Sequence, residues 1–232
     1  MKNKYFSVMF LVLIYLAYML TSDEAVKVMK NLLHSGKEVE QITVVIDAGH
    51  GGRDPGKVGV NDALEKDINL SIAFKLKSLL EQNGITVIMT RSDDSGLYSE
   101  TDSNKKNADL NERINIIHNN KADFAISIHQ NSFGEEYVKG AQVFYHSASN
   151  DGKILAETIQ QQLKDTLQDG NHRMAKSNAS YYMLKKTECP LVIVECGYLS
   201  NRSEAALLVD DSYQDKLAWG IHLGIMKFIN RK

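Results

Sequence analysis

The sequence predicts an α/β fold: a single domain with a mixed, mostly parallel sheet and helices on both faces, preceded by an N-terminal hydrophobic segment. From residue 42 onward, short apolar runs typical of strands alternate with longer patterns typical of helices. Such alternation is characteristic of a sheet that helices cover on both sides. A length of 232 residues suits one such domain with a small appendage.

The first 20 residues have the pattern of an export segment. Lys2 and Lys4 precede an uncharged run over residues 5–20, which matches the basic and apolar regions of a signal peptide. The run is shorter than the roughly 20 residues that span a bilayer comfortably, and no A-x-A-like cleavage site follows it. We expect an exported protein whose residues 1–20 are a cleaved signal or an uncleaved membrane anchor. A buried core helix fits less well, because the run has no polar stripe.

Residues 21–41 are polar and are interpreted as a stalk, so the folded domain is expected over 42–232. A net charge of −2 and a pI of about 6.4 give no indication of a nucleic-acid partner. Cys189 and Cys196 are expected to be free thiols. Most of the chain between them is expected to form one strand, which would separate their Cα atoms by roughly 20 Å. A disulfide needs Cα atoms within about 7 Å of each other.

Apolar runs predict strands at 43–47, 85–90, 124–129, 140–145 and 191–195, with a weaker one near 182–185. Helical periodicity predicts helices at about 64–82, 109–119, 151–168 and 213–230. The last two carry apolar residues at i, i+4 spacing: Leu155, Ile159, Leu163 and Leu167, then Tyr213, Leu217, Ile221 and Ile225. Gly220 and Gly224 would weaken the final helix, which indicates close packing there.

A long polar loop, residues 92–107, follows the second predicted strand. Long loops in compact domains are usually functional or disordered. Because this one leaves the carboxyl end of a strand, we expect it to border the functional site. The alternative is a disordered insertion far from that site.

Four ionisable residues mark that site. His50 follows the strand at 43–47, His129 ends the strand at 124–129, and Glu195 ends the strand at 191–195. Glu65 opens the helix after the His50 loop. In open α/β sheets the site lies beyond the carboxyl ends of the strands, so these side chains can meet at one edge.

Two imidazoles and one carboxylate leave a fourth position on zinc open for water, as catalytic zinc sites require. Zinc lowers the pKa of that water to about 7 and polarises a carbonyl oxygen. A second carboxylate can take the proton of the water and later protonate a leaving amine. Either glutamate could be the ligand. The helix N-terminus favours an ionised Glu65, whereas burial favours proton transfer at Glu195.

Each residue also has a structural interpretation. Glu65 could complete a capping box with Asp62 as the N-cap. His50 could be a polar turn residue and His129 a satisfied core histidine. Glu195 is harder to explain in this way, because a buried carboxylate is unfavourable unless it is paired or coordinated. The remaining histidines are interpreted as structural: His34, His118, His146, His172 and His222.

Several segments together resemble one family. They are VVIDAGHGGRDPGKVG (44–59), the isolated Glu65, VIMTR ending at Arg91, ADLNERINIIHNNKADF with Arg113, SIHQN (127–131), and VIVECGYLSN (192–201) followed by Glu204. Over about residues 42–230 the chain resembles a zinc-dependent N-acetylmuramoyl-L-alanine amidase of the amidase-3 type. The resemblance implies Zn²⁺ bound by His50, Glu65 and His129, with Glu195 as the catalytic glutamate. It also implies hydrolysis of the peptidoglycan amide between the lactyl group of muramic acid and L-alanine.

A hydrophobic segment followed by a catalytic domain resembles the germination-specific amidases of the CwlD type. That resemblance implies a role in spore-cortex maturation and muramic δ-lactam formation, at the cell wall or in the spore intermembrane space. Some relatives depend on a protein activator, so the resemblance is compatible with such a partner for this chain. Two alternatives are a degenerate peptidoglycan-binding module without catalysis and a zinc peptidase that acts within the stem peptide.

Overall fold

The computed structural model describes residues 2–21, 27 and 41–231, in two compact units, residues 1–41 and 42–232. The first unit contains the helix α1 (Lys2–Thr21). The predicted polar stalk at 21–41 lies almost wholly outside the described residues. Within the described ranges, no helix combines the length and the apolar character that crossing a membrane requires.

In the described part of the second unit, six strands form one sheet in the order β2-β1-β3-β6-β4-β5. Their bounds are β1 (Thr43–Ala48), β2 (Thr86–Met89), β3 (Phe124–Asn131), β4 (Gln142–Tyr145), β5 (Lys176–Ser177) and β6 (Leu191–Tyr198). The strands β2, β1, β3 and β6 are parallel to one another. The strands β4 and β5 are parallel to each other, and β4 pairs with β6 in the antiparallel direction. The predicted mixed, mostly parallel sheet is confirmed.

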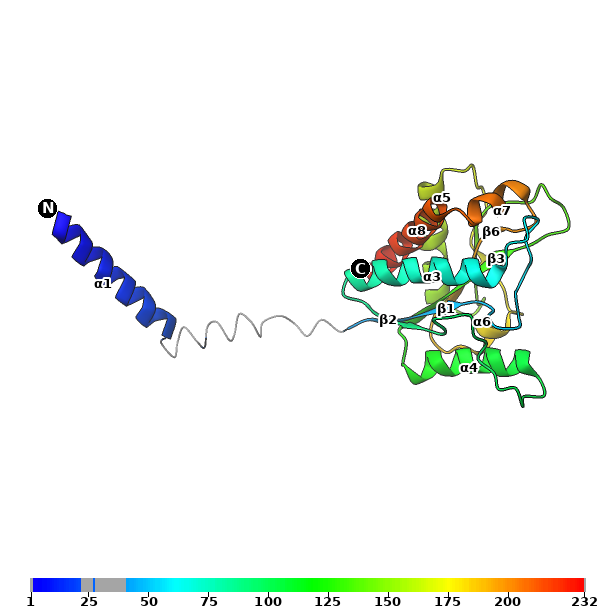
Figure 1. Ribbon diagram of the computed structural model, residues 1–232, viewed down its shortest axis with the longest axis horizontal. Helices are drawn as coiled ribbons and strands as arrows, with labels where there is room; N and C mark the ends of the chain where they lie inside the picture. The colour runs from blue at the N-terminus through cyan, green and yellow to red at the C-terminus, as the bar shows by residue number, and fades with distance from the viewer. Residues whose placement is uncertain (1, 22–26, 28–40, 232) are drawn as a thin grey trace. The chain divides into compact units, whose positions relative to one another are not determined.

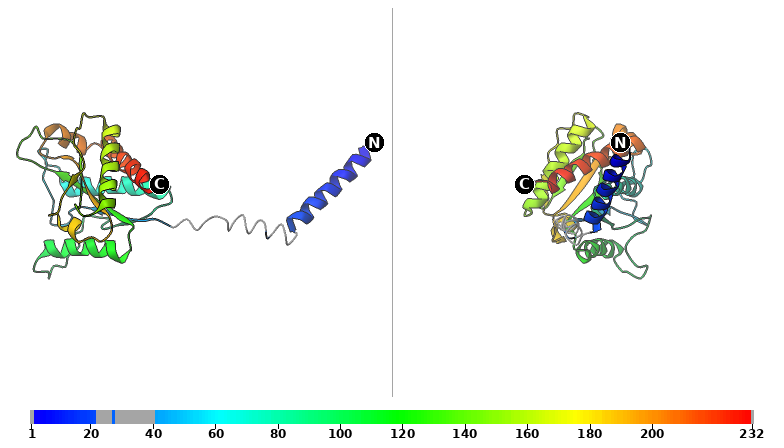
Figure 2. Two further views of the ribbon diagram at one scale, coloured as in Figure 1. Left: turned by 180° about the vertical axis from the view of Figure 1, so that it is seen from behind. Right: turned by 90° about the vertical axis from the view of Figure 1, so that its left-hand side faces the viewer.

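Helices cover both faces of this sheet (Figures 1 and 2). One face carries α3 (Glu65–Gln82), α5 (Asn150–Leu167) and α8 (Asp211–Ile229), and the other carries α4 (Lys105–Asn119) and α6 (Tyr182–Lys186). A short helix, α7 (Arg202–Leu208), follows β6. Strand alternation divides the two cores: Val44 and Ile46 pack on the α3 side, while Val45 packs on the α4 side.

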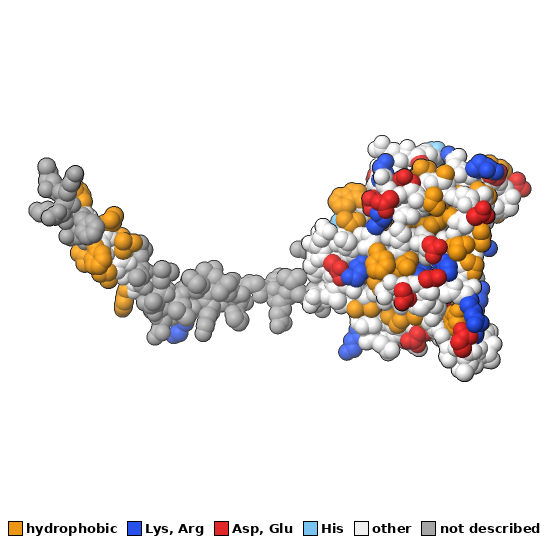
Figure 3. Space-filling view, viewed as in Figure 1, with side chains coloured by type: hydrophobic (Ala, Val, Ile, Leu, Met, Phe, Trp, Pro, Cys, Tyr) orange, Lys and Arg blue, Asp and Glu red, His pale blue; other side chains and the backbone are white. Residues whose placement is uncertain are grey.

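The glycines of α8 allow the close packing that the sequence predicts. A Cβ on Gly224 would lie 2.5 Å from the Cα of Ile159 in α5, and one on Gly220 would lie 3.2 Å from Leu163. On the outside of this layer, Lys75 of α3 pairs with Asp211 and Asp215 of α8. Acidic and basic side chains are interspersed on the face that carries α3 (Figure 3), which suits the small net charge.

The structure differs from the sequence prediction at several elements. The weak strand expected near 182–185 is wrong, because these residues form the helix α6, whose single turn is too short to show a helical period. Helix α4 begins at Lys105 rather than 109, since the Asn104 side chain accepts a hydrogen bond from the backbone N–H of Asn107. Strand β6 continues to Tyr198, so Glu195 lies within the strand rather than at its end. The cysteines are free, as predicted.

A buried ion pair joins α4 to the centre of the sheet. The Arg113 guanidinium, 1% exposed, donates to Asp47 of β1 at 2.6 Å and to Asp109 at 2.6 Å. Asp47 also accepts hydrogen bonds from the hydroxyl groups of Thr90 and Ser127. Burial favours the neutral form of Asp47, yet Arg113 outweighs it and holds the pKa at about 2. The pair is therefore fully charged and fully hydrogen-bonded.

We predict that Asp47→Asn lowers the free energy of unfolding by about 3 kcal/mol, because it leaves the buried Arg113 undercompensated. Urea unfolding of the wild type and the variant measures this difference. Lys153→Ala is the matched control. It removes an exposed pair with Glu157, 3.9 Å apart, and should change the free energy by less than about 0.5 kcal/mol. Equal effects of the two substitutions would contradict the prediction.

The stability difference between the wild type and Asp47→Asn should depend on pH. Asp47 has a pKa of about 2 when folded and an ordinary value of 3.8, so its contribution to stability is complete above roughly pH 4 and is lost as the pH falls through 2. The difference between the wild type and Asp47→Asn should shrink over this interval. A constant difference would show that the carboxylate charge does not matter.

Candidate metal centre

The turn after β1 presents His50. His50 has φ of 63°, in the left-handed region that few non-glycine residues adopt, and Gly51 and Gly52 also have positive φ. The carbonyl groups of the turn are bound by two arginines. Arg91 donates to Ala48 and Gly49 at 2.9 and 3.1 Å, and Arg113 donates to Ala48 and His50 at 2.8 and 2.7 Å. These bonds hold a strained conformation in place.

The ring of His50 is oriented from both sides. Its Nδ1 lies 2.8 Å from the Asp54 carboxylate, and its Nε2 lies 3.2 Å from Oε1 of Glu65. A carboxylate behind one ring nitrogen is the usual arrangement for a histidine that binds metal through the other. Sequence reasoning missed Asp54, although its spacing four residues after His50 in the HGGRD segment was a usable signal.

Glu65 is the first residue of α3 and is 2% exposed. Its Oε1 lies 2.9 Å from Nδ1 of His129 and accepts from the backbone N–H of Gln130 at 3.0 Å, while Oε2 accepts from the backbone N–H of Lys57 at 2.7 Å. Burial favours the neutral form, but the hydrogen bonds of His129 and His50 outweigh it and hold the pKa of Glu65 well below its usual range. This glutamate is an ionised carboxylate.

The capping-box alternative for Glu65 is wrong. The N-cap of α3 is Leu64, which is extended, and no side chain of the described residues caps it. Asp62 has φ of 63° and lies in the preceding turn. The Glu65 carboxylate is thus free of a capping role and faces the histidines.

His129 brings the third donor from β3. The rings of His129 and His50 lie edge to face, with centroids 5.0 Å apart. One donor atom from each of His50, Glu65 and His129 lies within 4.8 Å of the other two. Burial opposes protonation of His129, yet the Glu65 carboxylate raises its pKa to about 9. A metal ion would replace that proton, since a ligating imidazole must be neutral.

Two glycines make room for these side chains. A Cβ on Gly49 would lie 2.3 Å from the His129 ring, and one on Gly56 would lie 2.5 Å from Oε2 of Glu65. Gly56 also has φ of 69°, which favours glycine. Any larger residue at Gly49 would displace the His129 ring.

Glu195 lies beside this group. It pairs in parallel register with His129, so both side chains leave the sheet on the same face. Glu195 is 9% exposed, and its Oε2 accepts no hydrogen bond from the described residues. Burial raises its pKa to about 7, with the charge of His129 opposing the shift and that of Glu65 adding to it. This carboxyl group can therefore gain and lose a proton near neutral pH.

The donor set suits a metal ion. Two imidazole nitrogens and one carboxylate oxygen are a set that catalytic zinc sites use. Glu195 adds a second carboxyl group, whose Oε2 has no hydrogen-bond partner among the described residues. The structure thus brings together all four residues that the sequence singled out. The other described histidines lie apart: His222, for example, meets Asn83 at 3.0 Å.

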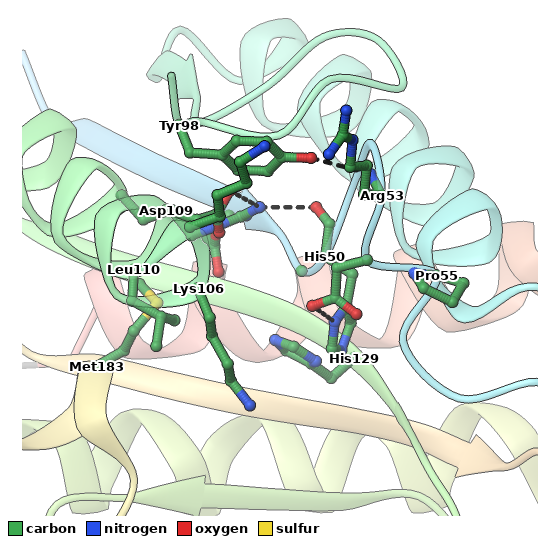
Figure 4. A pocket seen from close by; sticks show the side chains of 14 residues that line it. His50, Arg53, Pro55, Tyr98, Lys106, Asp109, Leu110, His129 and Met183 are labelled. Carbon is green, nitrogen blue, oxygen red and sulfur yellow. Dashed lines mark hydrogen bonds and ion pairs between the residues drawn. The ribbon is translucent and has the colours of Figure 1, made fainter. Parts of the chain in front are cut away.

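A pocket of about 350 Å³ opens over His50 and His129 (Figure 4). The loop that begins at Ser92 forms part of its wall through Tyr98, whose hydroxyl accepts from the backbone N–H of Arg53 at 3.1 Å. Asp94 of the same loop accepts from Gly52 at 3.0 Å. The prediction that this loop borders the site is confirmed.

Comparison with known proteins agrees with this geometry. Residues 44–227 match a family model, Amidase_3, described as N-acetylmuramoyl-L-alanine amidase. The chain is 38% identical over 192 residues to the germination-specific N-acetylmuramoyl-L-alanine amidase of Bacillus subtilis (strain 168), covering 82% of this chain and 80% of that protein.

The chain is also similar to solved structures of amidases. The CwlD amidase of Clostridioides difficile, determined in complex with the GerS lipoprotein, has a TM-score of 0.79 and 43% identity, covering 82% of this chain and 98% of that one. The catalytic domain of CwlV, from Bacillus (Paenibacillus) polymyxa var. colistinus, has a TM-score of 0.72 and 32% identity, covering 83% and 100%.

We predict that Gly49→Ala weakens binding of a divalent metal ion at least about tenfold, because the new methyl group displaces one of the donor rings. Titration calorimetry of the metal-free protein measures the affinity. Gly134→Ala is the matched control, since its Cβ would meet no described atom within 4 Å. Wild-type affinity in Gly49→Ala would show that His129 does not contribute a donor.

Proposed function

The chain belongs to the N-acetylmuramoyl-L-alanine amidase family, and we propose that it cleaves the lactyl–L-alanine amide of peptidoglycan with a zinc ion held by His50, Glu65 and His129. One observation carries the proposal: the three donor atoms lie within 4.8 Å of one another, beside a buried oxygen of Glu195 that has no hydrogen-bond partner among the described residues. When bound, zinc supplies Lewis acidity that polarises an amide carbonyl and lowers the pKa of water.

The side chains of the site divide the remaining work. Asp54 orients His50, and the hydrogen bonds to Glu65 keep that carboxylate ionised for binding. Glu195 is proposed to take a proton from the attacking water at its free oxygen and to give it to the nitrogen of the departing L-alanine. Burial raises the pKa of Glu195 to about 7 in the metal-free protein, and a bound zinc ion would lower it, so the group lies between two opposing influences that suit proton transfer in both directions.

The relatives suggest where this reaction is used. One relative is named as a germination-specific amidase and another as a CwlD amidase. We therefore propose a role in spore-cortex maturation. Removal of the peptide leaves a free lactyl carboxyl group, which can condense with the 2-amino group of the sugar, with loss of water, to a muramic δ-lactam once a separate deacetylase has removed the N-acetyl group. The CwlD amidase was determined with a lipoprotein, and we propose that this chain likewise has a protein partner.

The first unit is assigned to export. Residues 1–20 are proposed to be a signal or a membrane anchor, residues 21–41 a stalk, and residues 42–232 the zinc amidase domain. The basic residues Lys2 and Lys4 before an uncharged run support this division. The enzyme would then act at the cell wall or in the spore intermembrane space.

Mass spectrometry of peptidoglycan digested by the zinc-loaded protein tests the activity. Free lactyl groups with intact stem peptides identify the amidase. Shortened stems would identify the alternative peptidase, and no products would identify a binding module. The family match favours the first outcome over both alternatives.

Two substitutions distinguish the roles of the two glutamates. Glu195→Gln keeps the shape of the side chain but cannot transfer a proton, so it should retain zinc and lose turnover by roughly 100-fold or more. Glu65→Gln should instead lose zinc, since it removes an anionic donor. Metal analysis and rates on muropeptides measure both effects. If Glu195→Gln loses zinc and Glu65→Gln retains it, Glu195 is the metal ligand and Glu65 the group that transfers the proton.

A further inference from the structure

One cation of the catalytic pocket, Lys106, forms no ion pair or hydrogen bond with the described residues. Arg53, Lys105 and Lys106 all line the pocket. The first two are engaged, because Glu100 pairs with Arg53 at 3.0 Å and with Lys105 at 2.6 Å. The charge of Lys106 acts on the Asp54 carboxylate, but no ion pair or hydrogen bond within the described part of the chain holds its ammonium group, which can therefore bind a ligand.

Lys106 is placed to meet a substrate beside the metal centre. It lies in the first turn of α4, and in Figure 4 its side chain extends between Met183 and His129. Leu110, one turn further along α4, and Met183 of α6 give that side of the pocket an apolar wall. The positively charged ammonium group of Lys106 thus lies next to the apolar wall that Leu110 and Met183 form.

The charges of the proposed substrate lie on one side of the bond to be cut. The sugar half is neutral near that bond, because the lactyl carboxyl group is consumed in the amide. The peptide half carries an acidic residue directly after L-alanine. Two residues of chain span at most about 7 Å, so this carboxylate lies close to the scissile amide. An unpaired cation in the pocket is therefore complementary to the peptide half.

We propose that Lys106 is a specificity-determining residue that binds the carboxylate of the acidic residue next to L-alanine in the stem peptide. The inference rests on the proposed function and deepens it. Lys106 donates to the carboxylate, and the peptide half of the substrate lies along α4 toward Met183. Because the scissile amide is fixed at His50, Glu65 and His129, this contact sets the direction in which the substrate enters.

The contact is expected to be modest in strength. Lys106 is exposed, so water and salt screen its charge. An ion pair of this kind changes an equilibrium by about fivefold. The effect should appear as a change in KM, because the carboxylate is charged equally in the substrate and in the transition state.

The test uses the zinc-loaded full chain and two synthetic muropeptides that differ at one group, a free carboxylate or a carboxamide on the residue after L-alanine. The wild type should have a kcat/KM about fivefold higher for the carboxylate. Lys106→Ala should abolish this preference through KM, and Lys106→Glu should invert it. Lys106→Arg should keep it. Zinc content should be unchanged in all three variants.

Lys105→Ala is the matched control, since it removes an adjacent positive charge that is already paired with Glu100. It should keep the preference for the carboxylate. The proposal is overturned if Lys106→Ala keeps the preference, or if Lys105→Ala loses it equally. Failure of the wild type to cleave either muropeptide would instead overturn the amidase function itself, which separates the two failures.

Discussion

Two buried guanidinium groups hold the turn that presents His50 to the candidate metal centre. Arg91 and Arg113 together bind the carbonyl oxygens of three consecutive residues, Ala48 to His50. Buried carbonyl groups without partners are unfavourable, and the turn has left the strand ladder that would otherwise supply them. The positive charge of Arg113 depends in turn on Asp47 and Asp109. The position of the first proposed ligand therefore follows from an ion pair in the core.

The centre gives two glutamates opposite properties. Glu65 accepts backbone hydrogen bonds from Gln130 and Lys57 and faces two imidazoles, so its charged form is stabilised. Glu195 is nearly as buried but has an oxygen that accepts nothing from the described residues, so burial alone dominates and its pKa rises. Carboxyl groups with separated pKa values in one site are the usual basis of distinct binding and proton-transfer roles.

The sequence predicted every described strand except β5, the helices α3, α4, α5 and α8, and the four residues of the candidate centre, because each lies in or next to an apolar run or a helical period. It did not predict the short elements β5, α6 and α7, since so few residues show no period. The capping box failed because the left-handed turn at Asp62 depends on loop geometry. Asp54 was missed although it follows His50 by four residues, because that spacing alone does not establish that the turn brings the carboxylate to Nδ1 of His50.

The parallel pairing of His129 with Glu195 has an evolutionary consequence. These side chains are neighbours because main-chain hydrogen bonds set the register of β3 and β6, and successive residues of a strand face opposite sides of the sheet. Inserting or deleting one residue before His129 in β3 or before Glu195 in β6 would turn one of the two side chains away from the site, unless a bulge like the irregularity after His129 absorbed the change. Changes in length are therefore better tolerated in the loops, such as the segment that ends at Asn104, than in these two strands.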